Sequence, residues 1–190
     1  MFCNTISLTY GGDMFEVKIL TEGLDVNEER VIQAAGKHMQ YVFNHERFKE
    51  WVLGFSYVYK STTGRLWWKK TYEEKRNCFA NNQGLSNFQV YNKLMSGVEY
   101  LDPELDSQAD IFVKIDRRNR RGVIGYTYQN TKWQYIYHWV LDSWGIKDVA
   151  GNIAHEYAHK CSFDHAYYYT AERPFSVPYS IGSFVSNFKY

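Results

Sequence analysis

Proline and cysteine are both scarce in this chain of 190 residues, which contains 3 of each. A hydrophobic content of 45% with so few prolines argues against disorder and favours a compact globular protein. The cysteines Cys3, Cys78 and Cys161 are odd in number and far apart in sequence, which argues against a disulfide scaffold. Reduced thiols in a cytosol-like compartment fit this pattern best.

The chain also lacks a long apolar run and a strong charge of either sign. No stretch approaches the roughly 20 apolar residues that span a bilayer, and residues 1–10 do not form a signal peptide. A formal net charge of +1 supplies no overall field towards nucleic acid or an anionic membrane. We therefore expect a soluble, cytoplasmic protein with no nucleic-acid or membrane partner, with export by another route left open.

What the sequence does contain is a histidine motif near its C-terminus, beginning His155-Glu156-Tyr157-Ala158-His159. Residues four apart lie on the same face of a helix, so His155 and His159 can reach one metal ion side by side. Glu156 is rotated by roughly 100° from His155, where it can reach the open side of the metal without binding it. That position is the one a general base requires.

A third histidine, His165, follows His159 by six residues. One straight helix cannot present all three, so the helix must end near Cys161 or Ser162 and the chain must turn back. Three neutral imidazoles with one open position are typical of a catalytic zinc site, since structural sites are usually closed and Cys-rich. Cys161 is expected to point away from the metal.

The pattern HExxHxxSxxH resembles the HExxHxxGxxH motif of the metzincin zinc endopeptidases. The resemblance implies that His155, His159 and His165 bind zinc and that Glu156 is the catalytic base. Ser162 stands at the family's glycine, which adopts a left-handed conformation at the helix end. A serine there costs on the order of 1 kcal/mol.

The resemblance departs a second time where the family has its Met-turn. No Met follows His165; the counterpart is the segment at residues 175–182, in which Pro178 takes the Met position and Tyr179 follows directly. In some metzincins a tyrosine of this turn approaches the zinc, which implies a catalytic role for Tyr179. The pairs Arg173-Pro174 and Val177-Pro178 disfavour a regular helix and predict a turn beneath the metal. The likeness covers about the last forty residues well and the first hundred hardly at all.

The rest of the chain predicts an α+β domain, which the resemblance refines to a metzincin-like zincin. Such a fold has a twisted mixed sheet, a backing helix and an active-site helix in one compact domain, here residues 1–190. Residues 1–145 would supply the sheet and helices, and residues 146–190 the active-site helix, the third ligand and the Pro-Tyr turn. We expect strands at residues 5–10, 14–20, 55–59, 66–72, 111–115, 123–128 and 133–141 and helices at residues 28–43, 87–95 and 147–161, the first two capped by Asn27 and Ser86.

Other segments offer weaker sites. The acidic loop at residues 101–110 could hold a structural Ca²⁺, although a solvated loop is the simpler interpretation. Residues 67–70, Trp-Trp-Lys-Lys, combine stacking and cationic groups, but an amphipathic strand explains them better than nucleic-acid binding. The basic run at residues 117–121 is expected at the exposed tip of a hairpin. His38, His45 and His138 are expected to be structural or solvated, and Gly151 to leave room on the metal face.

The sequence thus predicts a zinc metalloendopeptidase that acts on a polypeptide substrate. Zinc would activate water and polarise the scissile carbonyl, Glu156 would move the proton, and Tyr179 would assist the oxyanion. The 17 Tyr of the chain suit a cleft that holds an extended polypeptide. Two alternatives remain: a zinc hydrolase acting on a non-protein amide or a peptidoglycan-like peptide, and a binding or toxin-like module whose zinc is structural.

Overall fold

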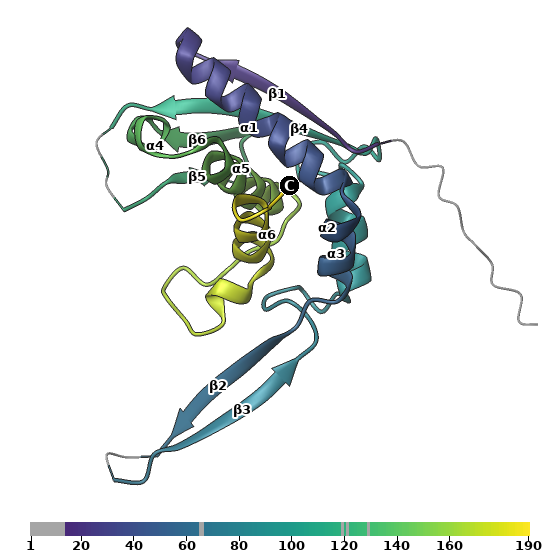
Figure 1. The fold of residues 1–190 in the computed structure, drawn as a ribbon, viewed down its shortest axis with the longest axis vertical. Helices are drawn as coiled ribbons and strands as arrows, with labels where there is room; N and C mark the ends of the chain where they lie inside the picture. The colour runs from purple at the N-terminus through teal and green to yellow at the C-terminus, as the bar shows by residue number, and fades with distance from the viewer. Residues whose placement is uncertain (1–13, 65–66, 119, 121, 129) are drawn as a thin grey trace, which may run out of the picture.

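A four-stranded mixed sheet forms one side of the molecule. The computed structural model describes residues 14–64, 67–118, 120, 122–128 and 130–190, so the strand expected at residues 5–10 lies outside it. The strands follow the order β1 (Glu16–Glu22), β4 (Gln108–Asp116), β6 (Trp133–Tyr137) and β5 (Gly125–Thr127). The first three are parallel, and β5 pairs antiparallel with β6 at one edge (Figure 1). The α+β class is therefore confirmed.

Two long helices form the core with this sheet. The helices α1 (Val26–Asn44) and α5 (Ile146–Lys160) contact each other, and α6 (Val177–Ser186) packs on α5. Alternate residues of β4, namely Ala109, Ile111 and Val113, are fully buried, because one face of the sheet is turned towards the helices. The apolar residues on the inner side of α5 are all fully buried: Val149, Ala150, Ile153, Ala154, Tyr157 and Ala158.

Local capping signals determine where several helices begin. Asp25, not Asn27, caps α1: its carboxylate accepts from the Glu28 backbone N–H at 2.9 Å, while the Glu28 side chain accepts from the Asp25 N–H. This reciprocal pair is a capping box. Ser86 caps α3 (Asn87–Met95) as predicted. His45 caps α2 (Glu46–Leu53) through Nδ1, so its structural role is confirmed.

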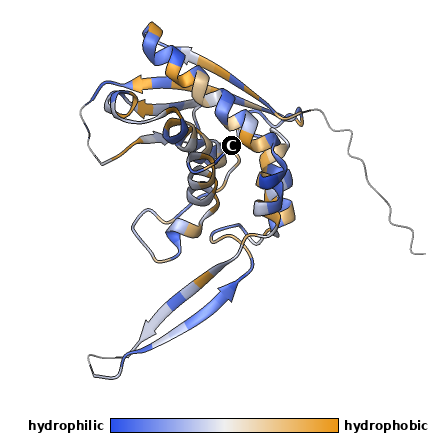
Figure 2. Ribbon diagram, in the orientation of Figure 1, coloured by the Kyte–Doolittle hydropathy of each residue, from blue (hydrophilic) through white to orange (hydrophobic). Residues whose placement is uncertain are grey.

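The strands β2 (Tyr57–Thr63) and β3 (Lys70–Arg76) form a separate antiparallel hairpin that projects from the body (Figure 1). They lie within a few residues of the predicted strands. The hairpin is mostly hydrophilic in Figure 2. Trp67 and Trp68, which lie between the two strands in sequence, are 91% and 82% exposed. At its base, the Tyr57 ring stacks on Phe175, with ring centroids 4.4 Å apart.

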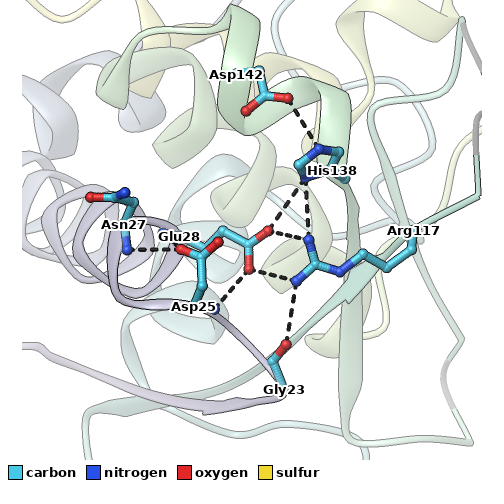
Figure 3. Close-up of polar contacts among 7 residues, drawn as sticks. All are labelled: Gly23, Asp25, Asn27, Glu28, Arg117, His138 and Asp142. Carbon is cyan, nitrogen blue, oxygen red and sulfur yellow. Dashed lines mark hydrogen bonds and ion pairs between the residues drawn. The ribbon is translucent and has the colours of Figure 1, made fainter.

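Arg117 and Arg118 do not lie at the tip of a hairpin, because β4 runs parallel to β6 and does not pair with β5. Residues 119 and 121 of the basic run lie outside the described residues. Arg117 instead reaches the start of α1, where its two terminal nitrogens donate to Glu28 at 2.6 and 2.8 Å (Figure 3). Arg118 folds back on Asp116 at the end of β4. The two arginines therefore join elements of the fold.

The strand predicted at residues 133–141 is too long. β6 ends at Tyr137 and His138 begins a short helix, α4 (His138–Ser143), so Trp139 lies in the helix and not in the strand. His138 bridges Glu28 and Asp142, at 3.3 and 3.2 Å (Figure 3). Its predicted structural role is confirmed. His38 is also structural, since it is buried between Val185 O and the Tyr190 hydroxyl.

No helix in the described ranges is both long and apolar enough to cross a bilayer.

Candidate metal centre

The three histidines of the motif converge. His155 and His159 project from α5, one turn apart, and His165 comes from the loop that follows the helix. One ring nitrogen of each lies within 4.8 Å of the others, and the Nε2 atoms of His155 and His165 are 3.3 Å apart. Within the part of the chain that the structure describes, this is the only such group of three or more His, Cys, Asp or Glu side chains.

The turn that returns His165 to the helix is built around Ser162. Ser162 adopts the left-handed conformation, with φ of 65°, as predicted for its position. The Ser162 N–H donates to His159 O at 2.9 Å, and the Phe163 N–H donates to Ala158 O at 3.0 Å. These two bonds make a Schellman motif, and the fully buried Phe163 ring anchors it.

Backbone carbonyls orient two of the imidazoles. Nδ1 of His159 lies 2.7 Å from Phe163 O, and Nδ1 of His165 lies 3.1 Å from Ala166 O. A carbonyl only accepts, so each Nδ1 carries the proton and each Nε2 offers its lone pair. Burial is the main cause that lowers the pKa of all three histidines, including His155. A lowered pKa favours the neutral imidazole, the form that binds a metal.

Glu156 lies beside this group and lines the same cavity. Its side chain is buried, and burial raises the pKa of its carboxyl group to about 8, with the charge of Lys160 acting in the opposite direction. A divalent cation held by the histidines would favour the ionised form again. Glu156 therefore has the setting of a base whose strength depends on a neighbouring metal.

Tyr179 also lies beside the histidines. The turn that was predicted to carry it is a helix in the structure, so that prediction is wrong. Its ring packs edge-on to His155, with centroids 4.6 Å apart at 85°, and lies 4.7 Å from the His165 ring. Val177 and Pro178 begin the helix α6 instead of a turn. Proline is compatible with the first turn of a helix, where its missing N–H has no intrahelical acceptor.

The room left by Gly151 is filled by protein. Gly182 of α6 lies against Gly151, so the two helices cross in backbone contact one turn before His155. Gly151 lines the cleft of the histidines, as expected for the metal face, but the space beside it is occupied by α6. Gly151 instead allows α6, with Tyr179, to approach the histidines.

A cleft of about 1260 Å³ opens over the histidines. One wall is the edge strand β5, which pairs only with β6 among the described strands, and another is the start of α6. Three arginines also line it, Arg118, Arg120 and Arg173. The sequence patterns single out neither β5 as the edge nor Arg173 as a wall residue, because both depend on contacts distant in sequence.

Lys160, which follows His159, is a further buried residue that the sequence did not single out. Its ammonium donates to Tyr128 O at 2.9 Å and to Thr131 O, so it holds the loop that follows β5. Cys161 is buried outside the histidine group, as predicted, and burial raises the pKa of its thiol to about 12. The calcium site at residues 101–110 stays a prediction.

No family model matches the chain, and no match is found among curated proteins or solved structures.

Proposed function

We propose that the chain is a metzincin-like zinc metallopeptidase, with His155, His159 and His165 as the zinc ligands. The observation that carries the proposal is the convergence of three imidazoles, two of them oriented through Nδ1 by backbone carbonyls. Hydrogen bonds of this kind are the usual outer shell of zinc-binding histidines. Three nitrogen ligands beside an open cleft fit a catalytic zinc better than a closed structural one.

Zinc bound there supplies Lewis acidity, which polarises a scissile carbonyl and lowers the pKa of an attacking water. Glu156 takes the proton from that water and delivers it to the leaving amine. Its burial keeps bulk water away from the carboxylate and makes proton transfer to the substrate more favourable than transfer to solvent. Tyr179, packed against His155 and His165, offers its hydroxyl to the oxyanion that develops on the carbonyl.

The edge strand β5 supports a polypeptide as the substrate. Its backbone pairs with β6 on one side, and its residues line the cleft. An extended peptide can add to such an edge through main-chain hydrogen bonds, as we expect in metzincin-like folds. Gly125 brings β5 close to α5, since a Cβ there would lie 2.6 Å from Asn152 Oδ1. A peptide paired with β5 would therefore run alongside the helix that carries the histidines.

The alternatives are less well supported. A binding module with structural zinc gives no role to Glu156, a buried carboxyl group in the wall of the cleft. A hydrolase for a small non-protein amide would use the same residues. The cleft of about 1260 Å³ exceeds what a small amide fills, because sites for drug-sized ligands measure about 300–1,000 Å³.

The test is hydrolysis of unfolded polypeptides by the zinc-supplemented protein, read as new termini by mass spectrometry. The wild type should cut, and Glu156→Gln should keep its zinc and lose nearly all turnover. Equal cutting by Glu156→Gln would end the proposal. Loss of zinc in that variant would show that Glu156 is a ligand and not a base.

A further inference from the structure

Arg173 is a cation beside the histidine group, and no acidic residue in the described part of the chain pairs with it. It lines the same cleft as the histidines, and its guanidinium carbon lies 4.9 Å above the centre of the Tyr179 ring. Tyr179 also packs on His155, so the guanidinium and the histidine contact the same ring. The guanidinium is therefore close enough to act on a substrate at the reacting bond.

No carboxylate of the described residues neutralises this charge. Among the described residues no carboxylate forms an ion pair with Arg173, and the acid before it in sequence, Glu172, binds Arg76 instead. One terminal nitrogen, Nη1, donates to Tyr167 O at 3.3 Å. Nε is buried and has no acceptor in the described ranges. Nη2 has no hydrogen-bond partner among the described residues, so this terminal nitrogen of the guanidinium can bind a ligand.

The main chain at Arg173 is held in place by hydrogen bonds. The Arg173 N–H donates to the carbonyl and hydroxyl oxygens of Thr170, at 3.2 and 3.1 Å. The residue begins the 3₁₀ turn η1 (Arg173–Phe175), whose Phe175 ring stacks on Tyr57. These bonds fix the Arg173 backbone, and the contacts with Tyr167 O and the Tyr179 ring position the guanidinium before any ligand arrives, which lowers the entropy that binding must overcome.

We propose that Arg173 binds a carboxylate of the peptide substrate, which makes the enzyme selective for peptides with an acidic group beside the scissile bond. This inference rests on the proposed function. A planar guanidinium with a free terminal nitrogen suits a carboxylate, and a carboxylate is the anion that a peptide can bring. It can be an Asp or Glu side chain or a free C-terminus. An extended peptide advances about 3.3 Å per residue, so the acidic group lies within a few residues of the cleaved bond.

Arg47 provides a matched control. Its guanidinium stacks on Phe188 at 4.7 Å and donates through Nη1 to Lys189 O at 2.8 Å, also without an ion pair in the described ranges. It lies outside the walls of the histidine cleft. The two arginines thus make contacts of the same kind, a stacked aromatic ring and one backbone carbonyl, but only Arg173 lines the histidine cleft. Loss of a cation–π contact alone would affect both variants alike.

The experiment measures peptide binding, so it does not depend on turnover. Fluorescent peptides are titrated into Glu156→Gln protein, with and without added zinc. One pair differs by Asp against Asn, and a second pair by a free against an amidated C-terminus. We expect at least one acidic peptide to bind about tenfold more tightly than its amide partner, a difference of about 1.4 kcal/mol. The pair that shows the preference identifies the source of the carboxylate.

Adding Arg173→Gln should bring this ratio close to one, while Arg47→Gln should leave it unchanged. No preference in either pair, or the same preference in Arg173→Gln, would overturn the inference. If Arg173→Gln does not fold, Arg173→Lys is tested in its place. Lysine keeps the charge but lacks the planar guanidinium, so it should lower the ratio of the two affinities several-fold. An unchanged ratio would contradict the proposal. If the wild type hydrolyses peptides without a preference for acidic ones, the Arg173 inference is wrong, while the proposal of a metallopeptidase is unaffected.

Discussion

Gly151 and Gly182 face each other across the crossing of α5 and α6. A Cβ on Gly182 would lie 2.7 Å from Gly151 O, and a Cβ on Gly151 would lie 2.6 Å from Gly182 O. Neither contact leaves room for a side chain. Tyr179 precedes Gly182 by three residues on the same face of α6, and His155 follows Gly151 by four on α5. The close crossing is therefore what brings Tyr179 onto the histidine.

Gly182→Ala should destabilise the fold. The new methyl group meets backbone, which cannot rotate away, so α6 must shift from α5. We expect the free energy of unfolding to fall by about 1–3 kcal/mol, the usual cost of overpacking. Urea unfolding followed by circular dichroism measures it.

Gly36→Ala in α1 is the matched control. There the nearest atoms to the Cβ would be side-chain carbons, Cδ1 and Cγ1 of Ile19 at 2.6 and 2.7 Å and Cγ1 of Val17 at 3.7 Å, and the Ile19 side chain can move. Alanine is the better helix former by about 1 kcal/mol, so this variant should lose much less stability than Gly182→Ala. Equal losses would mean that the crossing is not tightly packed.

Tyr179→Phe should slow peptide hydrolysis while zinc content stays unchanged. Phenylalanine keeps the ring contacts with His155 and His165 and removes only the hydroxyl. Loss of one oxyanion donor lowers kcat on the order of 10²-fold, with little change in KM. Steady-state kinetics beside zinc analysis distinguishes the roles, since an unchanged kcat would reduce Tyr179 to a packing residue.

Asp116 should contribute acid-sensitive stability next to the edge strand. Its carboxylate accepts from Arg118 Nε at 2.9 Å and from the Tyr126 hydroxyl of β5 at 3.0 Å. The bonds from Arg118 are the main reason that its pKa is lowered to about 2. Because the folded pKa lies below the unfolded value of about 3.9, this stability is present above pH 4 and lost as the pH falls towards 2.

Asp116→Asn should therefore be less stable than the wild type at pH 7, and the gap should close between about pH 4 and 2. Glu74→Gln is the control, since the Glu74–Arg76 pair is exposed and contributes little. Thermal unfolding at a series of pH values measures the stability of both variants relative to the wild type. A gap that is constant with pH would contradict the assignment.

Much of the site is predictable because its determinants are local. The spacing of His155 and His159 depends only on helix geometry. The left-handed Ser162 follows from the need to return His165 to the helix. Likewise, α3 begins at its predicted cap, because Ser86 and Gln89 form a capping box within four residues. Such patterns can be read without knowing the rest of the fold.

The errors arise where distant contacts decide. Pro178 fits a turn or a first helical turn equally well, and the crossing at Gly182 selects the helix. The alternating pattern through His138 and Trp139 suits a strand, but α4 begins there after β6 has paired with β4. Arg173 shows no pattern of its own, since only the folded chain places it beside Tyr179.

The central claim is that the three histidines hold zinc, and zinc per chain tests it most directly. Elemental mass spectrometry on the wild type, His165→Ala and His45→Asn makes the comparison; asparagine keeps the cap of α2, so this control loses a histidine outside the group. We predict one zinc per chain in the wild type and the control, and much less in His165→Ala. A wild type that stays metal-free when zinc is offered, or equal zinc in His165→Ala, would contradict the account.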